Sequence, residues 1–348
     1  EIPLRLVGSE MCIRDSNSNI INHKKMIHII LCTDENYVMP CGITIFSICY
    51  NNKCNHLFFH ILTEGVSSSK KAEIKYLVET YGQKIDFYDV NSSLLGNVPV
   101  NNRFRISIYY RLLMANILPK NISKILYLDS DIIVRGNLQE IWEIDITDKA
   151  LGAVLDQSCD DIRNYNRTNL LPLCGYYNSG VLLINLDYWR KAKIGEACIQ
   201  YVNENCDKVI YPDQDALNVV TQKLWAKLSF KYNVQAHMYH KANEILARTN
   251  YINEMMTASQ NPLILHFTEA LKPWMIGCRH PFTTEYIKYK NMSPWRNTPL
   301  VIKKNIGKVD SILTIIKKLC IKIRIAKPAL IYSPYRSFNH DTLPEYQR

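Results

Sequence analysis

The sequence predicts an α/β fold built on a mostly parallel sheet that is flanked by helices. Short apolar runs of strand length alternate with longer segments of helical character, and several of these runs end in polar or acidic residues. The chain has 348 residues, 47% of them hydrophobic, which is enough for one large domain with a small appendage. We find no run of roughly 18 apolar residues of the kind that spans a membrane.

The expected elements follow these runs in order. Five segments are expected to be strands: apolar runs at residues 27–32, 57–62, 125–134 and 177–186, and the segment 84–89. Three intervening segments are expected to be helical, at residues 41–50, 69–81 and 107–115. Alternation of this kind is typical of strands joined by crossover helices, so most neighbouring strands should be parallel.

The run at 125–134 carries Asp129 and Asp131 in its middle. In an extended strand, residues two apart point to the same side, so we expect the two carboxylates to lie together. Like charges that are buried side by side are costly, and a bound cation removes that cost. Carboxylate oxygens suit Mg²⁺ or Mn²⁺, which also hold phosphate oxygens. The pattern therefore favours a site for a metal-bound nucleotide phosphate over a solvated loop.

Three further features fit the same site. The first strand runs into a polar, acidic turn at 33–36, where α/β sheets present their ligand loops. The strand at 177–186 is entered through Asn178 and Gly180. His266, an imidazole that could bind a metal, is followed six residues later by the cation Lys272. Each signal is weak alone, and the combination is what carries the interpretation.

Taken together, these motifs resemble the retaining glycosyltransferases of family 8, whose bacterial members add galactose or glucose to lipopolysaccharide and whose eukaryotic members include glycogenin. The resemblance runs from about Met26 to Trp274. Its motifs are Cys-Thr-Asp-Glu-Asn-Tyr at 32–37, Tyr-Tyr-Arg-Leu at 109–112, Tyr-Leu-Asp-Ser-Asp at 127–131, Tyr-Asn-Ser-Gly at 177–180, Asp-Gln-Asp at 213–215, and His266 with Lys-Pro-Trp at 272–274. Membership implies a GT-A fold, a UDP-sugar donor, Mn²⁺ (or Mg²⁺) as cofactor, and retention of the anomeric configuration.

The resemblance also implies roles for the residues around the metal. Asp129, Asp131 and His266 would bind the metal, and the metal would bind the diphosphate of the donor. Lys272 would pair with a phosphate oxygen and help UDP to leave. Arg111 would reach the sugar or pyrophosphate of the donor, unless it only ties its helix to a surface carboxylate.

A second group of residues matches the donor-binding motifs. Asp34 and Asn36 correspond to the uracil and ribose contacts, and Cys32 would act through its backbone. Tyr37 and Ser130 belong to the same motifs and are assigned to the donor site with them.

The residues that match the surroundings of the transferred sugar are Asp156, Asn178, Asp213 and Gln214. Asp156 would accept hydrogen bonds from sugar hydroxyls, and Gln214 would lie on the reactive face of the anomeric carbon. A neutral amide is a poor nucleophile, so a front-face displacement is favoured, with the leaving phosphate accepting the proton of the acceptor. Asp213 is the nearest carboxylate that could act as a nucleophile instead, and the sequence leaves both routes open.

Other classes of protein share some of these features. Haloacid dehalogenase phosphatases also use Asp-x-Asp after a strand, but they place Thr or Val where this chain has Ile133. A self-glucosylating primer protein like glycogenin needs an accessible tyrosine, and the 22 tyrosines leave that alternative open. A binding protein without activity is disfavoured because each expected metal and phosphate residue is present.

The expected organisation is a leader at 1–22 that resembles cloning read-through, a catalytic domain at 23–285, and a basic amphipathic C-terminal tail at 286–348. Residues 301–327 contain eight basic residues and one acidic residue, interleaved with apolar ones at helical spacing. Such a helix suits an anionic membrane surface, and nothing in the catalytic domain suggests nucleic acid. Eleven cysteines, without a Cys-x-x-Cys pair, fit reduced thiols. We expect a cytoplasmic protein, peripheral on the inner face of the cell membrane, with a glycan or glycolipid acceptor.

Overall fold

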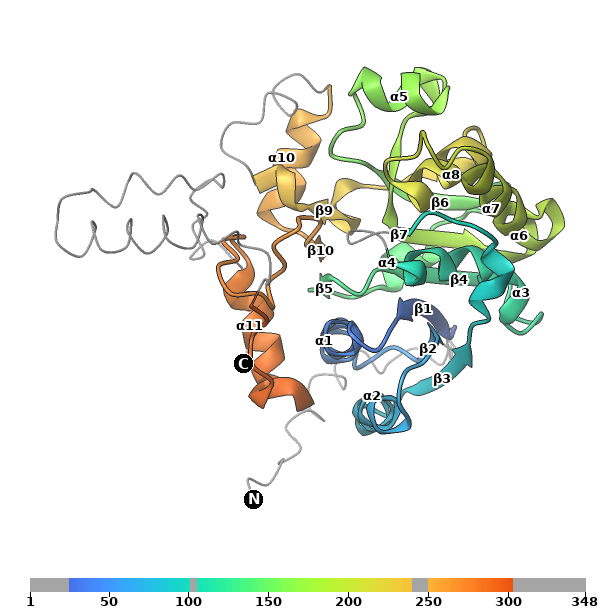
Figure 1. The fold of residues 1–348 in the computed structure, drawn as a ribbon. Coiled ribbons are helices and arrows are strands. Elements are labelled where there is room, and N and C mark those ends of the chain that lie inside the picture. The colour runs from blue at the N-terminus through green and yellow to red at the C-terminus, as the bar shows by residue number, and fades with distance from the viewer. Residues whose placement is uncertain (1–24, 101–104, 240–249, 303–348) are drawn as a thin grey trace, which may run out of the picture.

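A seven-stranded sheet forms the centre of the protein in a computed structural model that describes residues 25–100, 105–239 and 250–302 (Figure 1). The strands lie in the order β3-β2-β1-β4-β7-β6-β8. In chain order they are β1 (Ile27–Thr33), β2 (Leu57–Thr63), β3 (Lys84–Asp89), β4 (Lys124–Leu128), β6 (Leu151–Leu155), β7 (Tyr177–Asn185) and β8 (Trp225–Lys227). Because β1 to β4 are mutually parallel, the expected α/β fold with a mostly parallel sheet is confirmed.

Side chains of the central strands alternate between two apolar layers. Ile29 and Leu31 of β1 belong to the cluster that contains α1 (Val38–Asn51), while Ile30 belongs to the cluster on the opposite face. Successive side chains of a strand point to opposite faces of the sheet. Because both faces of β1 are covered, residues of both sets are apolar, and the strand is an almost continuous apolar run. The helix α2 (Ser68–Thr80) connects β2 to β3, as expected.

The Asp-x-Asp run differs from the expected single strand at 125–134. The chain leaves the large sheet at the end of β4 and enters a second sheet as β5 (Ile132–Val134). This second sheet has the order β5-β10-β9, with β9 (Val234–Gln235) and β10 (Ile264–His266). Asp129 and Asp131 therefore lie in the turn between two sheets, because β4 pairs with β1 and β7 whereas β5 pairs with β10.

The segment expected as a helix at 107–115 is wound more tightly. It forms a 3₁₀ helix, η2 (Ile106–Leu113), followed by the short α3 (Met114–Ile117). Five consecutive residues, 109–113, are buried, so the segment is enclosed on all sides rather than along one stripe. The amphipathic spacing of an ordinary surface helix does not apply to a segment in this position.

The remaining helices surround the sheet edges and the site. They are α4 (Gln139–Glu143), α5 (Ile162–Thr168), α6 (Leu186–Ala192), α7 (Ile194–Glu204), α8 (Pro212–Val220), α10 (Ile252–Gln260) and α11 (Thr283–Met292). Short 3₁₀ turns lie between them: η1 (Ser92–Leu95), η3 (Pro172–Cys174), η4 (Phe230–Tyr232), η5 (Ala236–Tyr239) and η6 (Pro294–Asn297). In Figure 1, α6, α7 and α8 lie together on one side of the sheet, and α11 lies on the side of α1.

The expected boundary between catalytic domain and tail, at 285/286, falls within α11. Tyr286, Tyr289 and Trp295 belong to the same apolar cluster as α1. Gly42 of α1 makes this packing possible, since a Cβ atom there would lie 1.9 Å from the Trp295 ring. The basic segment of the expected tail, from residue 303 onward, lies outside the described residues. Among the described helices, none is long and apolar enough to cross a membrane.

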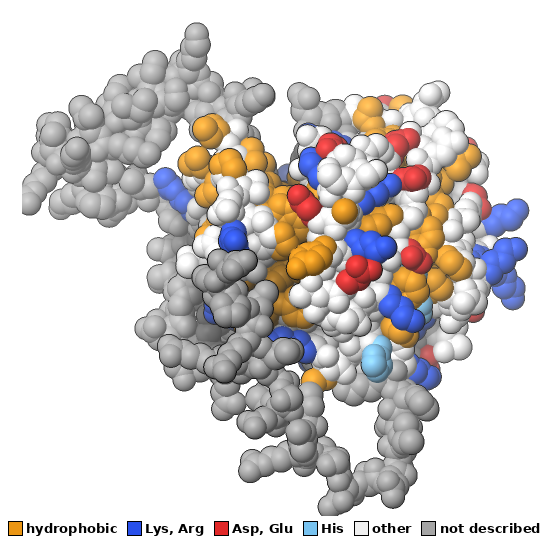
Figure 2. Space-filling model, turned by 90° about the horizontal axis from the view of Figure 1, so that it is seen from below, with side chains coloured by type: hydrophobic (Ala, Val, Ile, Leu, Met, Phe, Trp, Pro, Cys, Tyr) orange, Lys and Arg blue, Asp and Glu red, His pale blue; other side chains and the backbone are white. Residues whose placement is uncertain are grey.

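The face seen from below carries intermixed charge. α2 lies at the bottom of Figure 1, and Figure 2 shows basic and acidic side chains interspersed with apolar ones on this face. Lys70 of α2 pairs with Glu35 at 2.7 Å, and Lys71 pairs with Asp89 at 2.7 Å. Exposed pairs of this kind contribute little to stability, typically about 0–1 kcal/mol. We therefore interpret the face shown in Figure 2 as ordinary solvent-exposed surface.

Candidate active site and metal centre

Two carboxylates and an imidazole come together where the chain passes from the first sheet to the second. Asp129, Asp131 and His266 each offer one ligand atom, and these atoms lie within 4.8 Å of one another. The β10–β5 register places His266 opposite Ile132, one residue after the Asp-x-Asp turn. Within this set, His266 Nε2 lies 3.2 Å from Asp131 Oδ1 and 3.6 Å from Asp129 Oδ2. Oxygen and imidazole donors in this arrangement fit a divalent cation such as Mn²⁺ or Mg²⁺.

Backbone contacts from both sheets hold the Asp-x-Asp turn. The Asp129 N–H donates to the carbonyl of Gly180 in β7 at 2.9 Å, and the Phe267 N–H donates to the carbonyl of Asp131 at 3.0 Å. Gly180 also leaves room for the ligands, because a Cβ atom there would lie 2.2 Å from His266 Cε1. The glycine of the Asn-Ser-Gly motif is thus required by space in the metal cluster.

A buried asparagine that the sequence analysis did not single out orients His266. Asn233 Oδ1 lies 3.0 Å from His266 Nδ1, and Asn233 Nδ2 donates to Asn178 Oδ1 at 2.9 Å. Since an amide oxygen can only accept, the imidazole carries its proton on Nδ1, and Nε2 keeps the lone pair that a metal needs. Asn233 is fully buried and precedes β9. Because Asn233 and His266 are 33 residues apart, short-range patterns do not reveal this contact.

Lys272 contacts Asp131 of the Asp-Asp-His cluster. Its ammonium donates to Asp131 Oδ2 at 2.7 Å and to the carbonyl of Phe267 at 2.6 Å. Burial acts to raise the pKa of Asp131, but the Lys272 ammonium outweighs it, so the pKa lies well below its ordinary value. Asp131 is therefore ionised, which is the form in which a carboxylate could bind a metal. The Lys272 ammonium lies where it could also meet a phosphate oxygen of a metal-bound ligand.

Arg111 links the metal cluster to the helix α8. Its guanidinium donates to Asp129 Oδ1 at 2.7 Å and lies 3.2 Å from Asp213 Oδ2. The guanidinium carbon lies 4.3 Å from the centre of the Tyr127 ring, and the Tyr127 hydroxyl donates to Asp129 Oδ1 at 2.6 Å. Burial raises the pKa of Asp213, and Arg111 opposes that rise. Arg111 thus ties the segment η2 to two buried or half-buried carboxylates of the site.

The residues expected around the transferred sugar form one hydrogen-bonded group. Asn178 Nδ2 donates to Asp156 Oδ2 and to Gln214 Oε1, both at 3.1 Å. Gln214 Nε2 donates to the same oxygen of Asp156 at 3.2 Å, and the Ser179 N–H donates to Gln214 Oε1 at 3.1 Å. The Ser179 hydroxyl donates to Asp213 Oδ2 at 3.1 Å. The amide of Gln214 is thereby fixed in one orientation, and all four predicted residues meet at the start of β7 and α8.

The residues of the expected donor loop lie at the end of β1. The Ser130 hydroxyl donates to the carbonyl of Cys32 at 2.9 Å, which joins this loop to the Asp-x-Asp turn. Asp34 Oδ1 accepts from the N–H groups of Asn36 and Tyr37 and so shapes the turn before α1. Tyr37 packs edge-on against Trp274, with ring centres 5.7 Å apart.

Asn36 is exposed, and its N–H donates to Asp34 Oδ1 within the turn. Its predicted role at the ribose or uracil stays a prediction.

This geometry defines an α/β protein with an Asp-Asp-His cluster, suited to a divalent cation, between two sheets, and sequence comparison identifies the family. A model of the family described as "Glycosyl transferase family 8" matches residues 28–276. The chain therefore belongs to glycosyltransferase family 8, as the motifs predicted.

The curated relatives of this chain include two lipopolysaccharide glucosyltransferases and a general stress protein. A lipopolysaccharide 1,2-glucosyltransferase of Escherichia coli is 30% identical over 273 residues, which cover 76% of this chain and 78% of the relative. The lipopolysaccharide glucosyltransferase WaaO of E. coli K12 is 29% identical, covering 78% and 80%. General stress protein A of Bacillus subtilis is 27% identical, covering 78% and 95%.

Solved structures agree on the fold. An active-site mutant of LgtC matches with a TM-score of 0.70 and 24% identity, covering 77% of this chain and 96% of that one. The galactosyltransferase LgtC, solved in complex with donor and acceptor sugar analogues, matches with a TM-score of 0.68 and 24% identity, covering 78% and 99%. The expected GT-A fold is thereby confirmed.

Proposed function

We propose that the protein is a metal-dependent, retaining hexosyltransferase that moves galactose or glucose from a UDP-sugar to a glycan or glycolipid acceptor, in lipopolysaccharide or surface-polysaccharide synthesis. The observation that carries the proposal is the cluster of Asp129, Asp131 and His266 with the Lys272 ammonium beside it. Mn²⁺ or Mg²⁺ held there would neutralise the diphosphate of a leaving UDP. The relatives that act on lipopolysaccharide supply the acceptor class.

In the transfer, the bond between the anomeric carbon and the phosphate oxygen breaks, and a bond to the acceptor oxygen forms on the same face. The proton of the acceptor hydroxyl goes to the departing phosphate. Lys272 stabilises the charge that develops on UDP, and Asp156 accepts hydrogen bonds from the sugar. Asp213 Oδ2 is held by Arg111 and Ser179, which supports the front-face route over attack by this carboxylate.

The test is a panel of UDP-sugars with Mn²⁺, in which UDP release is measured with and without lipopolysaccharide-derived acceptors. We expect one UDP-hexose to be turned over, with loss of transfer in EDTA and in Asp129→Ala or Asp131→Ala. Asp187→Ala, an exposed carboxylate on α6, serves as the matched control. Lys272→Ala should raise the KM for the UDP-sugar through the lost charge-assisted contact. Full activity in EDTA would contradict the proposal.

Two further measurements test retention of configuration and the self-glucosylating alternative. NMR of the product linkage should show that the α configuration of the donor is kept, and a β product would contradict retention. Mass spectrometry of the protein after incubation with the donor alone should show no added hexose. A ladder of hexose additions on a tyrosine would favour the self-glucosylating alternative.

The membrane role is proposed from sequence alone, because the basic residues from Lys303 onward lie outside the described part of the chain. Each basic residue near an anionic surface contributes on the order of 1 kcal/mol. We expect the protein to sediment with vesicles that contain anionic lipid, and truncation after about Trp295 to release it. Equal binding to neutral vesicles would contradict an electrostatic anchor and the peripheral location on the inner face of the membrane.

A further inference from the structure

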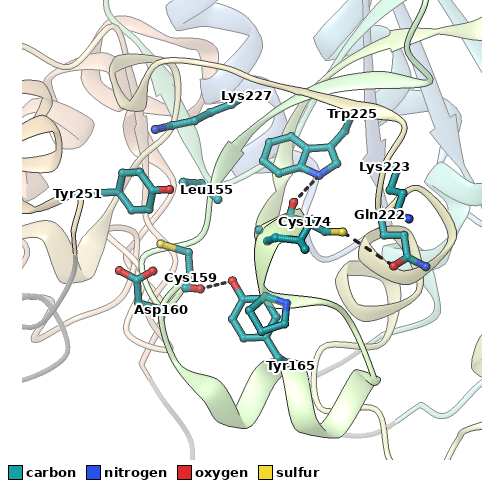
Figure 3. A pocket seen from close by; sticks show the side chains of 13 residues that line it. Leu155, Cys159, Asp160, Tyr165, Cys174, Gln222, Lys223, Trp225, Lys227 and Tyr251 are labelled. Atoms are coloured by element: carbon teal, nitrogen blue, oxygen red, sulfur yellow. Dashed lines mark hydrogen bonds between the residues drawn. The ribbon is translucent and has the colours of Figure 1, made fainter.

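A pocket of about 500 Å³ opens beside the site, on the outer edge of the large sheet (Figure 3). It lies between the segment 159–175, the chain around β8, and Tyr251 at the start of α10. Its volume is in the range of small-molecule sites, about 300–1,000 Å³. None of the residues expected to bind the donor, the metal or the transferred sugar lines it.

One wall of the pocket presents an aromatic ring between two cations. Trp225 and Lys227 are two residues apart in the edge strand β8, so their side chains share one side of the strand, and Lys223 lies in the turn that precedes it. Figure 3 shows the Trp225 indole with its face turned to the open pocket, while its Nε1 donates to the carbonyl of Cys174 at 3.0 Å. That bond fixes the plane of the ring. Tyr251 lies across the pocket from it.

The pocket has the mixed chemistry that a pyranose ring requires. An aromatic face contacts the C–H groups of a sugar, and nearby amide and charged groups bind its hydroxyls. Gln222, Lys223 and Asp160 supply such groups around the pocket. An acyl chain in the same place would desolvate these groups without compensation, at a cost of several kcal/mol. The chemistry therefore points to a saccharide, in spite of the exposed Leu173 at the rim.

Two residues that line the pocket are close in the chain to residues of the proposed transfer site. Leu155, the last residue of β6, lines the pocket, and the next residue is Asp156 of the sugar-binding group. Gly175 also lines the pocket and is three residues from Asn178. At about 3.3 Å per residue in extended chain, the Cα atoms of Gly175 and Asn178 are at most about 10 Å apart. This distance is comparable to the length of a disaccharide.

We propose that this pocket binds a pyranose unit of the glycan acceptor, remote from the hydroxyl that receives the transferred sugar, with the ring stacked on Trp225. The inference rests on the proposed function for the identity of the glycan. Binding of a sugar unit in this pocket would let the enzyme distinguish a longer acceptor from a shorter one, because only the longer glycan reaches from the transfer site to the pocket.

The test uses Trp225→Ala and Lys223→Ala, with Tyr76→Ala on α2 as the control for loss of an exposed aromatic. The probe is a set of purified lipopolysaccharide core oligosaccharides together with their isolated terminal monosaccharides. We expect Trp225→Ala to weaken binding of the oligosaccharides at least tenfold in glycan-array or NMR titrations, and Lys223→Ala to weaken it several-fold. UDP binding by calorimetry should be unchanged in all three variants, which also shows that they are folded.

Transfer kinetics separate this proposal from the proposed function. In the active enzyme, both pocket variants should raise the KM for the longer acceptors and leave that for the monosaccharides unchanged. If the wild type transfers sugar but the variants have the same KM for every acceptor, the pocket proposal is overturned and the function stands. If the wild type neither binds nor modifies any oligosaccharide in the set, the pocket proposal is overturned as well. Binding of detergent or lipid in place of glycans would also overturn it.

Discussion

Gly180 lies directly against His266. A Cβ atom on Gly180 would be 2.2 Å from His266 Cε1 and 2.8 Å from Asp129 Oδ2. The two elements that carry these residues, β7 and β10, belong to different sheets, so the metal cluster depends on their close approach. The smallest possible side chain at position 180 is therefore a structural condition for the site.

We expect Gly180→Ala to lower Mn²⁺ affinity at least tenfold, because the methyl group must displace the imidazole or the carboxylate. Calorimetry or Mn²⁺ EPR measures this directly. Gly136→Ala is the matched control, since a Cβ atom there meets Leu263 at an ordinary 3.4 Å. Equal affinities in the two variants would show that the cluster adapts to a side chain at 180.

Asn233 should act as a positioning residue for the metal. Replacing it by Leu removes the acceptor for His266 Nδ1, and loss of such an outer contact typically costs 10–100-fold in metal affinity. Asn233→Asp keeps an acceptor and should recover most of that affinity. Asn52→Leu, another buried asparagine with backbone partners, controls for general destabilisation. Metal affinity that follows thermal stability alone, without recovery in Asn233→Asp, would contradict the role.

Arg111→Met should destabilise the protein by about 3–5 kcal/mol, because it leaves Asp129 and Asp213 without their shared cation. Urea unfolding at pH 7 measures the loss. Adding Asp213→Asn should restore part of it, since one of the two stranded charges is then removed. A double variant that is as unstable as the single one would show that lost packing, and not charge, is responsible.

Arg135→Met separates the effect on stability from the effect on metal binding. Arg135 is also buried and pairs with Glu285 at 2.8 Å, but it lies outside the metal cluster. We expect it to lower stability while Mn²⁺ affinity remains, whereas Arg111→Met should lower both. Equal Mn²⁺ affinities in the two variants would contradict a role of Arg111 in the site.

His60 should make the protein less stable in mild acid. Burial and the neighbouring His28 lower its pKa to about 3 from an ordinary value near 6.5. Between these values the unfolded chain binds more protons than the folded one, so the free energy of unfolding falls as the pH drops below about 6.5. At pH 5 the loss is about 2 kcal/mol, from about 1.36 kcal/mol per pKa unit.

The measurement is chemical denaturation at pH 7.5 and 5.0. His60→Phe keeps a ring stacked on Phe58, 4.4 Å away in the native protein, and should lose about 2 kcal/mol less than the wild type between the two pH values. The exposed His56→Phe serves as the control. A pH dependence that is the same in His60→Phe and the wild type would contradict the assignment.

The sequence by itself determined the order of the elements and most of the site residues. The strands at 27–32, 57–62 and 84–89 appear within one residue of their expected limits. For β1 and β2 the apolar run reports burial in the sheet directly, whereas β3 is an edge strand in which no residue is fully buried. The predicted ligands Asp129, Asp131 and His266 come together in space. Their roles in catalysis stay predictions.

Only the tertiary structure decided where the Asp-x-Asp segment changes sheets. An apolar run indicates burial but not the partner to which a strand is hydrogen-bonded. The hydrophobic pattern of the sequence therefore does not show that the chain changes sheets between β4 and β5. The same limit applies to Asn233, whose contact with His266 joins residues far apart in the chain. It applies equally to Gly180, since the space it leaves is filled by a side chain from the other sheet. Local sequence carries propensity and burial, whereas the geometry of the site comes from how distant segments pack.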